Sequence, residues 1–86
     1  ETAAEQFHVD AIYNLGYLYE NGIAVAQDGN KAIAYYKQAA LLGDYQAKVN
    51  LAHAYEIGEC VPKNEEEAHK WHAAAQAQLQ EATEEW

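Results

Sequence analysis

The chain has 86 residues with fourteen acidic and five basic side chains, which give a formal net charge of −9 at pH 7. This length supports one domain with a small core, since short domains bury only about 60% of the surface that their unfolded chains expose. All five bases are lysines and they are scattered, so the clustered cations that phosphate binding requires are missing and nucleic acid is a poor candidate partner.

Two copies of one unit make up most of the chain, because nine residues between Ala11 and Ala39 recur 36 positions later. A unit that returns the same small and apolar residues in register is one supersecondary element stacked on its copy, and the stack buries a face that neither copy could bury alone. The recurring pairs are Ala11 and Ala47, Asn14 and Asn50, Leu15 and Leu51, Tyr19 and Tyr55, Glu20 and Glu56, Gly22 and Gly58, Val25 and Val61, Ala32 and Ala68, and Ala39 and Ala75.

The first ten residues are predicted to be the end of a preceding unit's second helix, followed by a turn. This prediction rests on Ala3 and Ala4, which lie one period before Ala39 and Ala40. We therefore expect the chain to be a segment of a longer repeat protein, and the missing initiator methionine agrees with that expectation.

A helix is predicted from about Val9 to Asn21 by apolar residues at spacings of three and four, and Gly22 is well placed to end it. After a short loop, Asp28 can cap a second helix through its side-chain oxygen, and Gly43 closes that helix. The predicted packing faces consist of Ile12, Leu15, Gly16 and Tyr19 on the first helix and of Ala32, Tyr35, Tyr36, Ala39 and Ala40 on the second.

The second unit is predicted in the same way, with Asp44 as the cap, a helix over about 45–57 and Gly58 as its stop. After the next loop, Asn64 fills the cap position of the last helix. Glu67 follows three residues later and completes the pattern of a capping box.

The last helix is predicted to begin near Glu65 and to reach Ala82, because Leu79 stands where Gly43 ended the earlier helix. The acidic side chains of its first turn are favoured there by the helix dipole. A helix that continues past the usual stop fits a terminal capping helix with a polar outer side. The single domain 1–86 then divides into residues 1–10, a first repeat at 11–46 and a second repeat at 47–82.

The first unit reads Ala11-x3-Leu15-Gly16-x2-Tyr19-x2-Gly22-x2-Val25-x2-Asp28-x2-Lys31-Ala32-x2-Tyr35-Tyr36-x2-Ala39-Ala40-x2-Gly43. This pattern resembles the Sel-one-like repeat (SLR), a relative of the tetratricopeptide repeat with a longer loop between its helices. The resemblance implies an all-α fold, a right-handed α-α superhelix (solenoid) of antiparallel helix pairs in which the first helix of each pair lines a concave face. It also implies an adaptor or scaffold that brings proteins together and whose repeats are not usually catalytic.

Two features depart from that family's pattern. The second loop glycine is replaced by Ala24 in one unit and by Cys60 in the other, which leaves open whether the loops keep a left-handed residue there. His72 stands where the first unit has Tyr36, and we expect it to pack as an aromatic.

The candidate binding surface comprises residues about a third of a turn away from the packing faces of the two first helices. Exposed tyrosines beside acidic groups suit an extended or helical peptide with basic residues, because tyrosine offers rigid contact area and a hydroxyl group. The same residues could instead pack against a neighbouring repeat, so a purely structural spacer is the alternative. The surface consists of Asp10, Tyr13, Tyr17, Glu20, Asn21, Gln46, Val49, His53, Glu56 and Ile57.

Catalysis and metal binding are not expected, and no cofactor is predicted. His69 and His72 could share an ion, but a closed zinc site needs four ligands and no third ligand lies at a comparable spacing. The lone Cys60 cannot form an intrachain disulfide, and Glu56 and Glu59 should raise its pKa, which disfavours a nucleophilic role. The chain has no serine and no glycine-rich phosphate loop, so most enzyme classes lack their chemistry here.

No apolar run approaches the roughly 20 residues of a membrane span, so no membrane insertion is expected. The first five residues lack the basic and apolar regions of a signal peptide. A lone cysteine identifies no redox compartment. The sequence therefore predicts no location for the protein.

Overall fold

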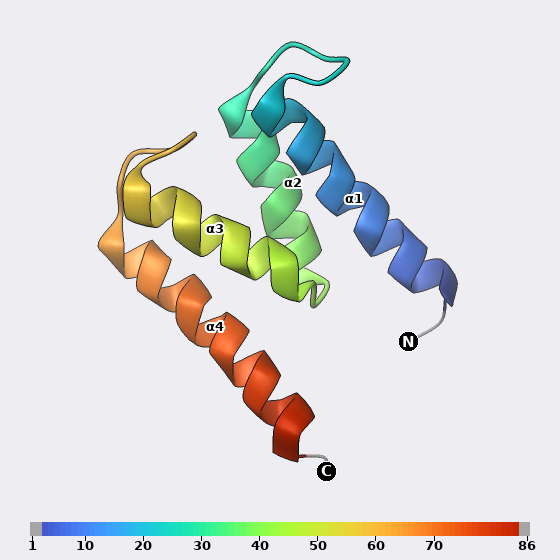
Figure 1. The fold of residues 1–86 in the computed structure, drawn as a ribbon, viewed down its shortest axis with the longest axis vertical. Helices are drawn as coiled ribbons and strands as arrows, with labels where there is room; N and C mark the ends of the chain where they lie inside the picture. Colours follow the sequence, from blue (N-terminus) through green and yellow to red (C-terminus); the bar gives the residue numbers. More distant parts are fainter. Residues whose placement is uncertain (1–2, 85–86) are drawn as a thin grey trace.

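The computed structural model describes residues 3–84, and Figure 1 shows them as four helices joined by short loops. The helices are α1 (Ala3–Asn21), α2 (Gly29–Leu41), α3 (Tyr45–Ile57) and α4 (Glu65–Glu84). No strand occurs among residues 3–84, so the predicted all-α class is confirmed. The molecule is flat, with extents of 43 × 33 × 14 Å.

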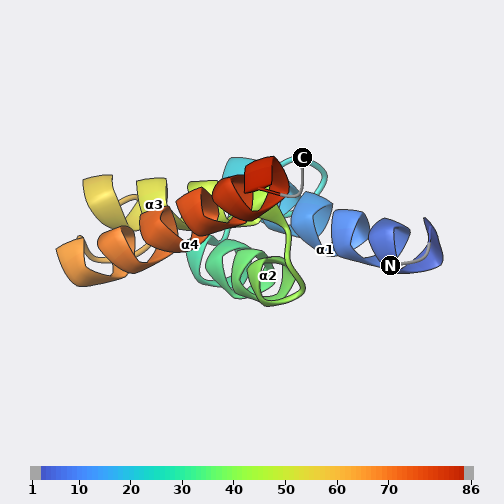
Figure 2. The same ribbon diagram turned by 90° about the horizontal axis from the view of Figure 1, so that it is seen from below.

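Two antiparallel hairpins, α1 with α2 and α3 with α4, build the molecule. Helix α2 also packs against α3 and thereby joins the hairpins. The second view shows α2 on one side of the molecule and α3 on the other (Figure 2). This arrangement is the predicted stack of one helical unit on its copy.

The predicted caps lie where α2, α3 and α4 begin. The carboxylate of Asp28 accepts a hydrogen bond from the backbone N–H of Lys31 at 3.2 Å, and Asp44 accepts one from Ala47 at 3.0 Å. Asn64 Oδ1 accepts the N–H of Glu67 at 3.1 Å. Each cap satisfies a backbone donor that the first turn of a helix leaves without a partner.

Only half of the expected capping box forms at the last helix. The backbone N–H of Asn64 donates to the carbonyl of Tyr55 at 2.9 Å and so closes the loop, instead of meeting the carboxylate of Glu67. The Glu67 carboxylate lies 3.7 Å from the Nζ atom of Lys70. The loop of the first unit is closed in the same way, by the N–H of Asp28 and the carbonyl of Tyr19 at 3.0 Å.

Both ends of the chain are more helical than predicted. Residues 3–10 belong to α1 without a break, so the expected turn before Val9 is absent from this region. Alanine, glutamate and glutamine favour helix, and no glycine or proline interrupts them. The last helix runs two residues past the predicted end at Ala82, while residues 1–2 and 85–86 of the predicted domain lie outside the described residues.

The loops keep a left-handed residue without glycine. Ala24 has φ 64° and Cys60 has φ 72°, and each follows a left-handed glycine by two residues. A side chain in this conformation costs about 1–2 kcal/mol, because its Cβ crowds the following carbonyl oxygen. The backbones of the two loops are therefore strained at equivalent positions. Both loops keep a left-handed residue where the family's second loop glycine is replaced.

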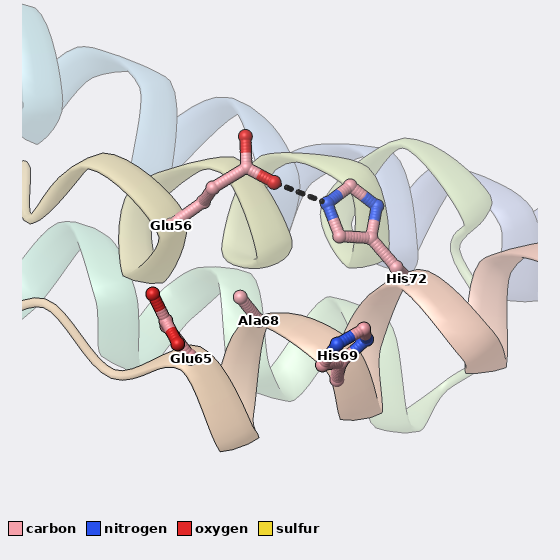
Figure 3. Close-up of a pocket in the computed structure, with 5 residues that line it drawn as sticks. All are labelled: Glu56, Glu65, Ala68, His69 and His72. Atoms are coloured by element: carbon pink, nitrogen blue, oxygen red, sulfur yellow. Dashed lines mark hydrogen bonds and ion pairs between the residues drawn. The ribbon is translucent and has the colours of Figure 1, made fainter.

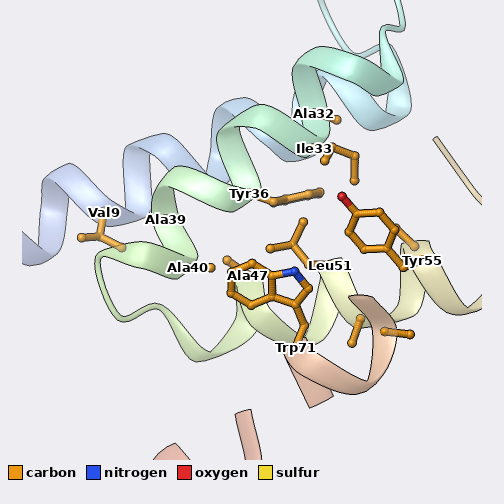
Figure 4. Packing of buried hydrophobic residues seen from close by; sticks show 13 residues of the cluster. Val9, Ala32, Ile33, Tyr36, Ala39, Ala40, Ala47, Leu51, Tyr55 and Trp71 are labelled. Carbon is orange, nitrogen blue, oxygen red and sulfur yellow. The ribbon is translucent and has the colours of Figure 1, made fainter. Parts of the chain in front are cut away.

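Small residues and a few large side chains form the core between the helices (Figure 4). Tyr36 and Leu51 are the largest fully buried side chains, and Trp71 lies beside them. The indole Nε1 of Trp71 is buried and has no hydrogen-bond partner among the described residues. Alanines fill most other core positions, which lets the helices approach closely.

Candidate protein-binding surface

The structure divides the ten residues of the candidate surface into two groups. The half-buried ones are Tyr13, Glu20 and Val49. The exposed ones are Asp10, Tyr17, Asn21, Gln46, His53, Glu56 and Ile57. All ten come from α1 and α3, and residues one period apart, such as Tyr17 and His53, occupy equivalent places on the two helices.

Tyr13 holds the two hairpins together. Its ring lies 5.4 Å from the ring of Tyr36, centroid to centroid, and its hydroxyl accepts a hydrogen bond from Asn50 Nδ2 at 2.9 Å. Burial raises the pKa of Tyr13, although the bond from Asn50 opposes that effect. The side chain is therefore engaged within the fold, and Asn50 is a contributor that sequence reasoning missed.

Glu20 is likewise occupied within the first hairpin. The hydroxyl of Tyr36 donates a hydrogen bond of 2.7 Å to Glu20 Oε1. Burial raises the pKa of Tyr36 well above its usual range, and the neighbouring carboxylate adds to the rise by disfavouring a phenolate. A neutral Tyr36 thus orients the Glu20 carboxylate.

The second hairpin repeats this contact with a different donor. Figure 3 shows His72 Nε2 facing Glu56 Oε2 at 3.2 Å, one period after the pair of Tyr36 and Glu20. These side chains line an open pocket of about 320 Å³ together with Glu65, Ala68 and His69.

The expectation that His72 packs as an aromatic is wrong. A Cβ atom on Gly16 would lie 2.9 Å from the ring of Tyr36, so the glycine makes room for that ring. Tyr36 is also covered from the other side, because α2 lies between α1 and α3, whereas α4 packs on α3 alone among the described residues. His72 therefore extends to solvent and bonds to Glu56.

Charge on the candidate surface is negative, because the lysines lie elsewhere. Lys31, Lys37 and Lys70 sit over the rings of Tyr19, Tyr55 and Trp71, with Nζ atoms 5.1–5.7 Å from the ring centroids. Lys48 donates to Gln78 Oε1 at 2.6 Å, and Lys63 lies 4.0 Å from Glu65. None of the lysines belongs to the ten surface residues, which include three acids.

Residues 3–84 bring together no group of three or more histidine, cysteine, aspartate or glutamate side chains that could hold a metal ion. Cys60 is half-buried, and a Cβ on Gly29 would lie 2.8 Å from its own Cβ. Burial raises the pKa of the Cys60 thiol, and Glu20 and Glu59 add to the rise. The sequence predicts that Glu56 and Glu59 raise this pKa. In the structure Glu20 takes the place of Glu56, because the loop that carries Cys60 packs against the first hairpin at Gly29.

None of the helices in residues 3–84 combines the length and the apolar character that a membrane span requires. Two antiparallel hairpins of one repeating pattern, joined by α2 and α3, define a helical repeat protein of the tetratricopeptide-like class. The Sel1 repeat matches residues 9–44 and 46–78. The chain therefore belongs to the Sel1 repeat family, whose helical repeats generally mediate protein interactions.

Two solved structures support this assignment. A Sel1 repeat protein from Oxalobacter formigenes is 37% identical with a TM-score of 0.76, over 81% of this chain and 53% of that one. A protective antigen present in uropathogenic Escherichia coli strains, which displays an SLR fold, is 43% identical with a TM-score of 0.78, over 88% of this chain and 16% of that one. The chain thus spans only part of either protein.

Proposed function

We propose that the chain is a protein-interaction module that binds a peptide or protein partner through the exposed part of the candidate surface. The observation that carries this proposal is the exposure of Tyr17, His53 and Ile57 on helices that also pack against the second helix of their own hairpin. Aromatic and aliphatic groups that remain in solvent on a rigid scaffold are typical contact residues of interfaces.

The partner that fits best carries basic residues. Asp10, Glu20 and Glu56 place carboxylates on or beside the exposed residues, and the whole chain has a net charge of −9. Electrostatic complementarity of this kind steers association and selects partners more than it adds affinity. We therefore propose that negative charge and aromatic contacts together select the partner of this surface. We assign the module no catalytic role.

A peptide display library tests the proposal with the full chain as bait. We expect enrichment of peptides with lysine or arginine beside apolar residues. The triple variant Tyr17→Ala, His53→Ala and Ile57→Ala should lose binding by at least tenfold, because hot-spot truncations cost about 1–2 kcal/mol each. These side chains are exposed, so helicity should stay unchanged.

The double variant Phe7→Ala and Leu41→Ala is the matched control, since it removes two exposed apolar side chains outside the candidate surface. It should bind the selected peptides as the parent chain does. Binding that survives the triple variant but not the control would contradict the proposal. Failure to enrich any peptide would favour the alternative of a structural spacer.

A further inference from the structure

The open pocket of the second hairpin is lined by two carboxylates, two imidazoles and one methyl group. Its volume of about 320 Å³ lies at the lower end of the range of roughly 300–1,000 Å³ that is typical of small-molecule sites. Figure 3 shows the buried Ala68 in the centre of the group, with the polar side chains around it. These polar side chains are Glu56, Glu65, His69 and His72. A pocket of this size holds one side chain of a partner and not a whole peptide.

The two carboxylates reach the pocket from different helices. Glu56 lies in the last turn of α3, and Glu65 is the first residue of α4. The last turn of α3 contains no basic residue, so the negative end of that helix dipole adds to the charge of Glu56. Together these groups make the pocket attractive to a cation.

The contacts that these carboxylates make in the free chain are exposed to solvent. His72 Nε2 lies 3.2 Å from Glu56 Oε2, and the two side chains are 48% and 58% exposed. Lys63 Nζ lies 4.0 Å from Glu65 Oε1, and both of these side chains are exposed as well. Because exposed pairs of this kind contribute little to stability, an incoming cation can replace them.

A guanidinium group fits this lining better than a metal ion or an ammonium group. Residues 3–84 place no three histidine, cysteine, aspartate or glutamate side chains where they could hold a metal ion. A guanidinium group is planar, so it stacks on aromatic rings while its N–H groups donate to a carboxylate in pairs. An ammonium group has no such plane and is more strongly hydrated. The pocket offers both imidazole rings and carboxylates.

The equivalent place in the first hairpin is filled by the chain itself. Glu65 and His72 stand where the first hairpin has Gly29 and Tyr36. Gly29 lies against Cys60, since a Cβ atom on the glycine would be 2.8 Å from the cysteine Cβ. Tyr36 is fully buried. The pocket is therefore a feature of the second hairpin, and the repeat pattern alone does not create it.

We propose that the pocket is the anchor site for one arginine side chain of a protein or peptide partner. The guanidinium group donates to the carboxylates of Glu56 and Glu65 and stacks on an imidazole ring. Glu56 also belongs to the candidate surface, and the exposed Ile57 follows it on α3. The inference rests on the proposed function, because it names the side chain by which the basic partner is recognised.

Nuclear magnetic resonance titration of the full chain with Nα-acetyl-L-arginine amide tests the pocket without a peptide. We expect saturable shifts of the Ala68 backbone amide and of the imidazole signals of His69 and His72 at millimolar ligand. The neutral isostere Nα-acetyl-L-citrulline amide should cause no saturable shift. The corresponding lysine amide should bind more weakly than the arginine amide, because its ammonium group does not stack.

Glu56→Gln together with Glu65→Gln removes both charges from the pocket. This double variant should weaken binding of the arginine amide at least about tenfold, since hydrogen bonds to an ionised acceptor are about twice as strong as neutral ones. Both positions are exposed, so helicity should stay unchanged. The matched control, Glu66→Gln with Glu81→Gln, makes the same change in net charge outside the pocket and should bind as the parent chain does.

Three results would overturn the proposal. They are the absence of a saturable shift, an equal loss of binding in the double variant and its control, and equal binding of the arginine and citrulline amides.

A failure of the proposed function has a different signature. If the display library enriches no peptide while the arginine amide still shifts the pocket signals, the arginine site stands and the peptide-binding module does not. If enriched peptides bind equally well after citrulline replaces their arginines, the module stands and the arginine site does not.

Discussion

The hydroxyl of Tyr36 donates a hydrogen bond of 2.7 Å to the carboxylate of Glu20, and this contact ties the two helices of the first hairpin together. The second hairpin has the same contact between His72 and Glu56, 36 residues later. The pair is thus a repeated feature of the fold, although its donor has changed from a buried ring to an exposed one.

Tyr36→Phe isolates the contribution of this hydroxyl. The ring still fills the space above Gly16, while Glu20 loses its donor, so we expect a loss of about 1–2 kcal/mol in the free energy of unfolding at neutral pH. Equilibrium urea unfolding measures this loss. His72→Ala is the control, because it removes the equivalent but exposed contact with Glu56. It should lower the free energy of unfolding by less than about 0.5 kcal/mol.

Alkaline pH should destabilise the chain through the same tyrosine. Because the pKa of Tyr36 is raised in the folded state, its contribution is fully present below the unfolded value of about 10 and is lost as pH rises above it. The free energy of unfolding should then fall by up to about 1.4 kcal/mol per pH unit for this group. The fall should be smaller in Tyr36→Phe, and an identical pH profile for both chains would count against the assignment.

Glycine at the strained loop positions should stabilise the chain. Ala24→Gly and Cys60→Gly each relieve the cost of a side chain at positive φ, and part of the gain is offset by the greater entropy of glycine in the unfolded chain. We expect a net gain of about 0.5–1 kcal/mol for Ala24→Gly, seen as a higher thermal midpoint, and a smaller gain for Cys60→Gly, because the half-buried Cys60 side chain packs against the core. Ala34→Gly, at an exposed helical site, should instead lose about 1 kcal/mol.

The cap of the last helix should depend on Asn64 and not on Glu67. Asn64→Ala removes the acceptor of the Glu67 N–H and should cost about 1 kcal/mol. Glu67→Ala should change stability by less than about 0.5 kcal/mol, because its carboxylate makes no bond back to the cap residue. Thermal unfolding followed by circular dichroism distinguishes the two, and equal costs would show that the full capping box forms in solution.

Leu51→Ala and Leu15→Ala form a matched pair one period apart. Leu51 is fully buried, so its truncation leaves a cavity and should cost about 2–5 kcal/mol. Leu15 lies at the edge of the stack, and its truncation should cost less than about 1 kcal/mol in the 86-residue chain. Denaturant unfolding of the two variants measures how much more the leucine of the second repeat contributes to the free energy of unfolding than the leucine of the first.

Helix placement could be predicted because its signals are local. Asp28, Asp44 and Asn64 cap the residues that directly follow them, and Gly58 ends α3 where it was expected to. The repeat period then showed that the hairpins stack, since no single copy could bury its apolar face.

The roles of individual surface residues depend on neighbours far along the chain. Tyr13 has the spacing of a surface residue, but Asn50, 37 residues away, takes up its hydroxyl. His72 stands where the first unit has a buried tyrosine, but α4 packs on α3 alone among the described residues, so the imidazole stays exposed. Neither relationship has a signature within one helix, so the sequence alone placed these side chains incorrectly or incompletely.

The close approach of Gly29 to Cys60 makes the spacing between the hairpins sensitive to a single methyl group. Alanine at position 29 would act as a wedge, because its Cβ would lie 2.8 Å from that of Cys60 and 2.9 Å from the Cys60 Cα. The second hairpin would have to tilt away from the first. In a solenoid each tilt adds to the next, so one substitution at this joint would alter the curvature of the whole array.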